Sequence, residues 1–440
     1  MNKIILSALT IVVSFNISAQ TFTGTGGYVE DYNGGYYRQE FLCEVYNLPE
    51  RIDSAFGLEQ ACINILHNRV SDLKITLEAP DGSSIWLTNR NGKDNGMNYS
   101  NTCFDMEAAE YIHRGEAPFT GNFIPDGRME YLNNGQNPNG YWKLIIEDLK
   151  KGFDGKLESF SLFFGSNPAR LKIKKKCSFE NAGLCDCMDG TTSCELLPDL
   201  VLLPSFTENQ IMEYAWDDSL YPGQLKLAAS IANIGYGPME IIGSNEWYCG
   251  EETVNGSIKC ADGNNSRQQI YQRIYIKNGS EFTWKDVKSG TMYYDEKPGH
   301  DHFHVDDWVE FRLVDTTNEN EKIVLARGQK VSYCLFNSGI CSSSDNVCNI
   351  YGQRYGEDMP NFGLGDYFEC STGKQGISVG GYDTYGMLYE GQFLQLPQNL
   401  KSGEYLLEIE IDPDNKYVES NKDNNSLRMK IIIQKQEQSD

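Results

Sequence analysis

The chain has 440 residues, a net charge of −24 at neutral pH and 13 cysteines. This length exceeds what one ordinary core requires and predicts two domains with connecting segments. The negative charge argues against nucleic-acid binding, because a phosphate backbone would be repelled, whereas it is compatible with cationic partners.

The first 19 residues have the pattern of a secretory signal peptide. Lys3 precedes an apolar run over 4–13, and the small residues Ser18 and Ala19 close the segment. The apolar run is too short to span a bilayer, and no other stretch is long enough. The cysteine count is typical of a compartment in which disulfides form, and an odd count leaves at least one thiol unpaired within the chain. We therefore expect a secreted, extracellular protein without a membrane span.

Residues 21–168 contain short apolar or alternating runs separated by turn-forming clusters. The predicted strands cover 73–77, 84–87, 142–146 and 157–164, and the predicted turns cover 80–82, 89–95 and 137–140. Many short strands at this spacing predict an antiparallel sandwich. The segments that carry a family resemblance are 70–73 (Val-Ser-Asp-Leu), 77–82 (Leu-Glu-Ala-Pro-Asp-Gly), 139–142 (Asn-Gly-Tyr-Trp) and 154–157 (Asp-Gly-Lys-Leu). They resemble the P-domain that follows subtilisin-like proprotein convertases, which implies a jelly-roll β-sandwich.

This N-terminal module has no recognisable protease machinery. The module lacks a Gly-x-Ser-x-Gly elbow, and neither His67 nor His113 has a recognisable Ser or Asp partner arrangement. His67 stands just before a strand and is better explained as a structural histidine. We expect the module to stabilise, to orient or to dock a protein partner.

A cysteine-rich connector is expected over 169–195. It holds Cys177, Cys185, Cys187 and Cys194, without the paired Cys-x2-Cys spacing of a zinc ribbon. In a secreted chain this favours a disulfide-stapled linker over a zinc site. Four cysteines allow three pairings, and all three stay open.

The region 196–435 is again β-rich, with strands predicted over 224–234, 270–276, 308–314 and 405–411. Its most informative segment is His-Asp-His-Phe-His at 300–304, which contains three of the five histidines of the chain. Neutral imidazole is a common ligand of copper and zinc. A straight strand would separate the first and third histidines by roughly 13 Å. One shared ion therefore requires a bend, which Pro298 and Gly299 could permit; a solvated polar strand face is the alternative.

Two further segments follow the histidines. Lys330 lies in Gly-Gln-Lys-Val-Ser-Tyr-Cys at 328–334, on the polar side of an alternating run. Tyr385 lies in the glycine-rich stretch 380–386, which can present an aromatic ring. Taken singly, they could be a surface lysine and a loop aromatic.

Together these motifs resemble the catalytic domain of lysyl oxidases. Their order is 197–201 (Leu-Pro-Asp-Leu-Val), the histidine run, 328–334, 382–386 (Tyr-Asp-Thr-Tyr-Gly) and 418–425. The resemblance implies a lysyl oxidase-type β-sandwich with long loops, in an all-β chain. It also implies copper ligands at His300, His302 and His304, and a lysine tyrosylquinone cofactor made from Lys330 and Tyr385.

The implied activity is the oxidation of primary amines, protein lysine side chains among them, by dioxygen. The products are an aldehyde, ammonia and hydrogen peroxide. A general base must remove a proton from the carbon next to nitrogen, and Asp383 and Asp307 are candidates that could equally be turn or surface carboxylates. The acidic balance of the chain would favour cationic substrates through long-range attraction.

The resemblance also implies a structural calcium site that ties the two ends of this domain together. Its ligands would be Asp199, the Leu200 carbonyl, Glu419, Asn421, Asn424 and Asn425. Oxygen-only ligands suit calcium. Asn421 stands where vertebrate members carry Asp, which should weaken binding unless Asp423 substitutes; a plain Asn-rich turn is the alternative.

Disulfides and loop length differ from those of vertebrate members. A Cys334–Cys341 pair resembles a family bridge, while Cys348–Cys370 and Cys249–Cys260 are predicted from proximity in sequence. The segment between Lys330 and Tyr385 carries an extra loop over 342–368. This insertion bears on the cofactor geometry, because the cross-link requires the two side chains to touch.

Two other functions are compatible with parts of this pattern. A non-catalytic copper-binding or adhesive extracellular protein would bind metal and form no quinone. A zinc hydrolase is disfavoured, because the chain lacks a His-Glu-x-x-His context.

Overall fold

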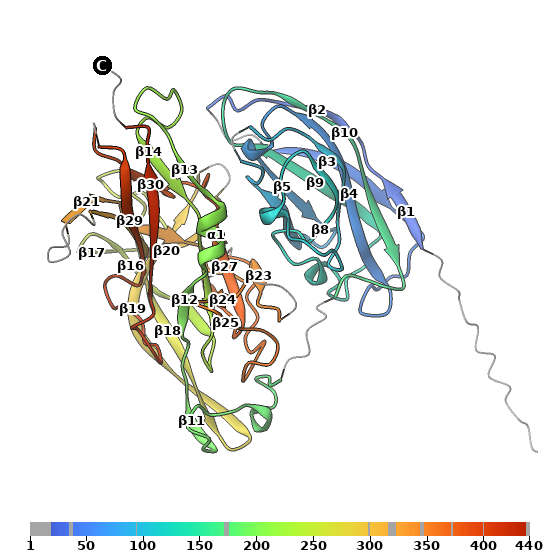
Figure 1. Ribbon diagram of the computed structural model, residues 1–440. Coiled ribbons are helices and arrows are strands. Elements are labelled where there is room, and N and C mark those ends of the chain that lie inside the picture. The colour runs from blue at the N-terminus through green and yellow to red at the C-terminus, as the bar shows by residue number, and fades with distance from the viewer. Residues whose placement is uncertain are drawn as a thin grey trace, which may run out of the picture.

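The computed structural model describes residues 19–34, 38–93, 95–170, 176–297, 300–315, 323–343, 347–370, 373–398 and 400–436. The predicted signal peptide lies outside the described residues, apart from Ala19. Two β-rich halves lie side by side, the first in blue to teal and the second in green to red (Figure 1). Helical structure in the described ranges is limited to α1 (Pro204–Asn209) and single 3-10 turns at Val70–Asp72, Ile112–Arg114, Met129–Leu132 and Ala182–Leu184. None of the described helices is long and apolar enough to cross a bilayer.

The N-terminal half is a sandwich of two sheets. One sheet has the strand order β1-β10-β4-β7-β8, with β2 paired to β10, and the other has the order β3-β9-β5-β6. The first sheet comprises β1 (Gln20–Thr23), β2 (Gly27–Val29), β4 (Gly57–His67), β7 (Tyr99–Phe104), β8 (Phe119–Phe123) and β10 (Gly155–Gly165). The second comprises β3 (Gln39–Val45), β5 (Leu73–Glu78), β6 (Ser84–Asn89) and β9 (Gly140–Asp148).

Alternating side chains build the core between these two sheets. Leu73, Ile75 and Leu77 of β5 and Ile85 and Leu87 of β6 all belong to one buried cluster. The residues between them in sequence point to the opposite face, as period-2 alternation requires. The four strands predicted in this half are confirmed, each within a few residues of its expected bounds.

The C-terminal half is organised around an 11-stranded sheet whose main path runs β17-β16-β18-β19-β20-β29-β30. Strands β11, β26, β21 and β22 pair with members of this path. The strands are β11 (Ser193–Leu196), β16 (Met239–Cys249), β17 (Glu252–Val254), β18 (Arg267–Asn278), β19 (Glu281–Asp295), β20 (His302–Asp315), β21 (Ile323–Arg327), β22 (Val331–Tyr333), β26 (Lys374–Ile377), β29 (Gly403–Ile411) and β30 (Ser426–Ile433).

Three smaller sheets complete this half. Their strand orders are β12-β15-β27-β23, β13-β14-β28 and β24-β25. The strands are β12 (Leu200–Leu202), β13 (Ile211–Glu213), β14 (Gln224–Leu227), β15 (Ala229–Asn233), β23 (Gly339–Ile340), β24 (Asn349–Ile350), β25 (Gln353–Arg354), β27 (Gly381–Tyr385) and β28 (Phe393–Gln395).

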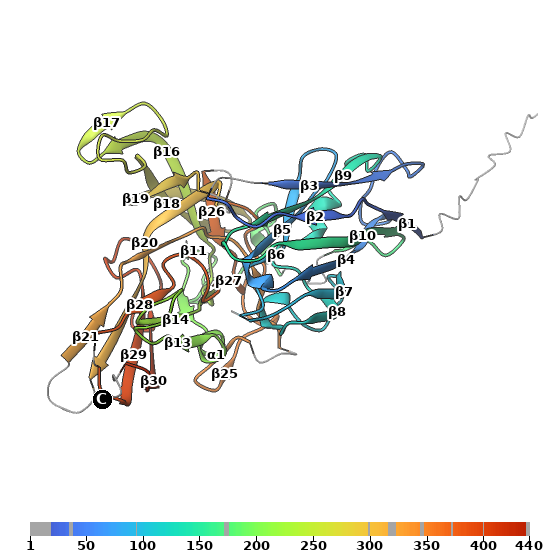
Figure 2. The same ribbon diagram turned by 90° about the horizontal axis from the view of Figure 1, so that it is seen from above.

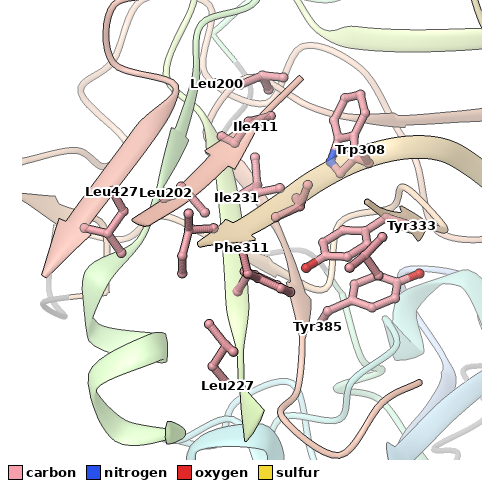
Figure 3. Close-up of a cluster of buried hydrophobic side chains, with 14 of the residues drawn as sticks. Leu200, Leu202, Leu227, Ile231, Trp308, Phe311, Tyr333, Tyr385, Ile411 and Leu427 are labelled. Carbon is pink, nitrogen blue, oxygen red and sulfur yellow. The ribbon is translucent and has the colours of Figure 1, made fainter. Parts of the chain in front are cut away.

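The main core of this half lies between the large sheet and the smaller ones (Figure 3). Phe311 and Ile411 from the large sheet face Leu202 and Ile231 from β12 and β15. An all-β chain made of two sandwich-like halves is thus confirmed, and Figure 2 shows the two halves from above.

One predicted strand is wrong in detail. The single strand expected over 224–234 is two strands, β14 and β15, in different sheets. The break falls at Ala228, whose N–H donates to the Gln210 carbonyl at 2.9 Å and whose carbonyl accepts from Thr207 Oγ1 at 2.9 Å. The segment around α1 therefore takes the hydrogen bonds that would have continued the strand.

Six disulfides join twelve of the thirteen cysteines, and Cys43 stays unpaired in the N-terminal core. The bridges are Cys62–Cys103, Cys177–Cys185, Cys187–Cys194, Cys249–Cys260, Cys334–Cys370 and Cys341–Cys348. The stapled linker and the Cys249–Cys260 pair agree with expectation.

The predicted Cys334–Cys341 and Cys348–Cys370 pairs are wrong. The Cys370 carbonyl accepts the Phe303 N–H at 2.9 Å, which holds Cys370 beside the histidine run and close to Cys334. Cys341 and Cys348 instead close a short loop of their own, seven residues apart, at the start of the expected insertion.

Candidate metal and cofactor site

The three clustered histidines converge because the chain bends at Asp301. His302 and His304 lie on one face of β20, whereas His300 precedes the strand. Asp301 adopts a left-handed backbone (φ 59°), and this turn brings His300 Nδ1 to 3.0 Å from His304 Nε2. One ring nitrogen from each histidine lies within 4.8 Å of the others. The chain therefore bends as one shared ion would require; Pro298 and Gly299, which we expected to permit a bend, lie outside the described residues.

The spacing of these nitrogens fits a common metal ion. Two nitrogen ligands about 2.0–2.1 Å from one metal, at right-angle to tetrahedral geometry, are roughly 2.8–3.4 Å apart, and the 3.0 Å contact falls in this range. His302 Nδ1 lies 2.7 Å from the His300 carbonyl, so it donates there and leaves Nε2 as the ligand atom.

Burial keeps the imidazoles in the form that binds metal. It lowers the pKa of His300, lowers that of His302 well below its ordinary value, and lowers that of His304 to about 3. Nearby imidazoles lower the last two further. All three rings are therefore neutral at pH 7, which is the ligand form.

Two carboxylates that the sequence motifs did not identify stand beside His300. Asp295 Oδ2 lies 3.6 Å from His300 Nδ1, and Glu390 Oε2 lies 3.5 Å from His300 Nε2. Lys297 pairs with Glu390 at 3.0 Å, so part of this negative charge is neutralised locally. Glu390 is 90 residues away in the chain, and no local pattern marks it.

The three histidines share a cavity of about 690 Å³ with Lys330 and Tyr385. Within it the two proposed cofactor precursors have different partners. Lys330 forms an ion pair with Asp414. The Tyr385 hydroxyl accepts the Cys334 N–H, and the Tyr385 ring stacks on Tyr333 with 3.7 Å between centroids (Figure 3). A cross-link thus requires Lys330 to leave Asp414.

The candidate bases stand apart from this cavity. Neither Asp383 nor Asp307 is among the described residues that line it. Asp383 is fully buried, and desolvation raises its pKa well above the ordinary value, which favours the protonated form. Asp307 is ion-paired with Lys416 at 2.7 Å. The structure therefore favours neither as a ready base, and the role of Asp383 stays a prediction.

The predicted calcium ligands gather where β12 meets the segment before β30. Asn424 Nδ2 donates to Asp199 Oδ1 at 2.7 Å, and Asn425 Nδ2 donates to Glu419 Oε1 at 2.7 Å. Glu419 Oε2 accepts the Leu200 N–H at 2.8 Å. These contacts tie the two ends of the C-terminal half together.

This oxygen cluster fits a hard cation. The side-chain oxygens of Asn424 and Asn425 are buried and have no hydrogen-bond partner among the described residues. Burial raises the pKa of Asp199, and raises that of Glu419 to about 7. A calcium ion would supply what these oxygens lack. Asn421 is exposed, and its side-chain oxygen accepts the Asp423 N–H at 3.1 Å, which is a turn contact.

The large cavity is built from both halves of the chain. The N-terminal half contributes Tyr32, Trp86, Asn89, Arg90, Leu149 and Lys150 to its lining. The lining holds five basic side chains, Arg90, Lys150, Lys226, Lys297 and Lys330, and two acidic ones, Asp295 and Glu390. The cavity therefore does not share the acidic balance of the whole chain.

Comparison with known proteins finds a match to part of each half. Residues 264–439 match the lysyl oxidase family model, and residues 59–164 match the proprotein convertase P-domain model. The chain thus carries a P-domain joined to a lysyl oxidase domain. Both resemblances inferred from the sequence are confirmed.

The curated relatives match only part of their own length. Protein-lysine 6-oxidase of Homo sapiens is 30% identical over 132 residues, which is 30% of this chain and 26% of the relative. The Sus scrofa protein of that name is 28% identical over 133 residues, 30% of this chain and 44% of the relative. Lysyl oxidase homolog 2B of Danio rerio is 26% identical over 183 residues, 40% of this chain and 20% of the relative.

Among solved structures, the crystal structure of a complex of Aeromonas sobria serine protease with its chaperone is 16% identical. It covers 34% of this chain and 26% of that chain, with a TM-score of 0.19.

Proposed function

We propose that this protein is an extracellular, copper-dependent amine oxidase with a lysine tyrosylquinone cofactor derived from Lys330 and Tyr385. It would convert a primary amine, dioxygen and water into an aldehyde, ammonia and hydrogen peroxide. The observation that carries the proposal is the convergence of three neutral imidazoles in the cavity that Lys330 and Tyr385 also line. The similarity to protein-lysine 6-oxidases supports amine oxidation in broad terms.

The residues of the chain would have two roles: some would hold the metal, and others would position the Tyr385 ring. His300, His302 and His304 would hold copper. Tyr385 would be held in place by its stack on Tyr333 and by the Cys334 N–H. When bound, the metal and the quinone supply the two-electron oxidation, while the protein orients the amine and excludes water.

Lys330 must act as a neutral amine to add to a ring carbon, and its ion pair with Asp414 opposes this. Both side chains of the pair are about one-third exposed, so the pair is easily broken. Release of Lys330 from Asp414 would therefore precede cofactor formation.

Calcium would bind between Asp199 and Glu419, with amide oxygens from Asn424 and Asn425. The two orphaned amide oxygens and the two buried carboxyls support this assignment. Asn421 would contribute less than the others, because its side chain is engaged in a turn.

A second function keeps the metal and omits catalysis. The ion pair of Lys330 with Asp414 favours it, because this contact opposes addition of the Lys330 amine to the Tyr385 ring. The protein would then bind copper at the cell exterior without forming a quinone.

One spectroscopic experiment separates the two functions. The purified chain is loaded with copper in air and treated with phenylhydrazine, with Tyr385→Phe as the matched control. A coloured adduct in the parent alone supports the oxidase. Bound copper without an adduct rejects the oxidase and leaves the metal-binding function.

The base is tested in the same preparation. If Asp383 removes the substrate proton, Asp383→Asn lowers kcat by roughly 10²–10⁴-fold while the phenylhydrazine adduct still forms. An unchanged kcat assigns the base elsewhere.

Substrate charge is tested by ionic strength. If the acidic chain attracts cationic substrates, kcat/KM for a lysine-rich peptide falls with salt more steeply than kcat/KM for an amine that has no charged group besides its amino group. Equal salt dependence would show that the basic cavity lining outweighs the overall charge.

A further inference from the structure

Part of the outer face of the P-domain sheet β3-β9-β5-β6 is buried, although it points away from the core of that domain. Lys74 and Thr76 alternate with the core residues of β5, yet they are only 5% and 9% exposed. Ile145 of β9, on the same outer face, is 1% exposed. In an antiparallel sandwich such a face is ordinarily solvated. Another surface of the molecule must therefore cover it.

The histidine cluster lies on the surface that covers this face. A cavity of about 230 Å³ separates the outer face from His300, His302 and the Cys334–Cys370 disulfide. Trp86 of β6 crosses this gap, and its ring centroid lies 5.7 Å from that of His302. Trp86 also meets Phe336 edge-on at 5.3 Å and packs against the main core of the lysyl oxidase domain.

Trp86 is itself held from the P-domain side. It alternates with Ile85 and Leu87, which anchor β6 in the P-domain core. The Lys74 ammonium lies 4.8 Å from its ring centroid, a cation–π distance. A ring clamped between two domains has little freedom to move away from His302.

Contacts on both sides of Trp86 fix the two domains together. Arg128 Nη1 pairs with Asp366 at 3.2 Å, and the Tyr131 ring stacks on Phe368 at 3.8 Å. Further contacts are the Tyr389 hydroxyl donating to the Asn89 carbonyl at 3.1 Å and Gln210 Nε2 donating to the His113 carbonyl at 3.1 Å. The P-domain is thus docked over the site.

We propose that the P-domain completes the active site, with Trp86 as a positioning residue that covers His302 and shields it from solvent. The domain is then part of the catalytic unit, and Asn89 and Arg90, just beyond Trp86, form a wall of the cavity that an amine would enter. The catalytic consequence rests on the proposed oxidase function, whereas the shielding of His302 does not.

Histidine reactivity in the full-length, metal-free chain tests the shielding. The parent, Trp86→Ala, Trp86→Phe and Tyr141→Ala are treated with diethyl pyrocarbonate, and tandem mass spectrometry follows each histidine. Tyr141 is a matched control, since it is a 55% exposed aromatic on β9 of the same domain. His300, whose side chain is 23% exposed, is the internal reference.

We expect the modification rate of His302 to rise severalfold in Trp86→Ala, to that of His300, and to stay at the parent value in Trp86→Phe and Tyr141→Ala. Near-ultraviolet circular dichroism and the thermal midpoint verify that each variant is folded. An unchanged His302 rate in folded Trp86→Ala overturns the proposal, as does an equal rise in Tyr141→Ala. If Trp86→Ala does not fold, Trp86→Leu, which also lacks a ring, takes its place: a raised His302 rate in folded Trp86→Leu supports the shielding, and an unchanged rate overturns it.

Copper-loaded protein supplies a second readout. Covering His302 predicts that the electron paramagnetic resonance spectrum of bound Cu(II) changes in Trp86→Ala, that the smaller ring in Trp86→Phe restores it, and that Tyr141→Ala leaves it unchanged. A parent that forms no phenylhydrazine adduct would reject the oxidase and leave the shielding intact. A parent that forms the adduct while His302 is unshielded would support the oxidase and reject the shielding.

Discussion

Glu419 makes the stability of the metal-free protein depend on pH in an unusual direction. Burial raises its pKa from the ordinary 4.5 to about 7. The folded state therefore binds this proton more tightly than the unfolded state does. The stabilisation is complete below pH 4.5 and is lost as the pH rises to about 7.

The size of the effect follows from these two pKa values. The difference between 4.5 and about 7 corresponds to roughly 3 kcal/mol in total. Between pH 5 and pH 8, about 2.5 kcal/mol of this is lost. Calcium would reverse the loss, because a cation stabilises the carboxylate that burial alone disfavours.

Urea unfolding at several pH values in the presence of EGTA measures this loss. The parent is compared with Glu419→Gln, which cannot ionise, and with Glu404→Gln, where the parent side chain is half exposed and pairs with Lys430. The difference between parent and Glu419→Gln isolates this group from the other titrating residues. We expect the parent and Glu404→Gln, but not Glu419→Gln, to lose the extra stability towards pH 8 and to recover it in millimolar calcium. Identical pH profiles for the parent and Glu419→Gln would refute the reasoning, and so would a calcium response that survives in Glu419→Gln.

Three other predictions concern the metal and cofactor residues. His302→Gln should bind far less copper than the parent by elemental analysis, because two imidazoles remain; full occupancy would contradict the shared site. Asp414→Asn should free Lys330 by removing an ion pair worth at most about 1 kcal/mol, so the quinone should form at most about fivefold faster. The absorbance of the adduct measures this rate, and slower formation would show that Asp414 assists instead. Replacing Cys334 and Cys370 together by Ser opens a bridge of sequence separation 36. This should lower the free energy of unfolding by up to about 4 kcal/mol, and an unchanged urea midpoint would contradict it.

The sequence predicted the strands well, because buried faces require alternation. The runs that became β5, β6 and β9 each alternate around a shared core, so their positions follow from local pattern. The sequence also indicated a metal site at the histidine run, since three imidazoles in five residues are rare. The bend could not be placed in advance, because it occurs at Asp301, a residue without an obligatory turn preference.

Contacts between distant segments were beyond local pattern. Glu390 reaches His300, and Cys370 reaches Cys334, only through the tertiary fold. The docking of the P-domain did leave a signal: Trp86 and Ile145 are large apolar residues on the face of their sheet that alternation assigns to solvent. Such residues indicate a covered face.

The unpaired Cys43 has a consequence for how the six bridges survive. Thiol–disulfide exchange begins with attack by a thiolate. Burial raises the pKa of the Cys43 thiol to about 11, so that about one molecule in ten thousand carries the thiolate at pH 7. Its sulfur is also enclosed by the P-domain core, where an external disulfide has no access. In the native state, a chain with thirteen cysteines therefore behaves chemically as one with twelve, and its cross-links are not reshuffled from within.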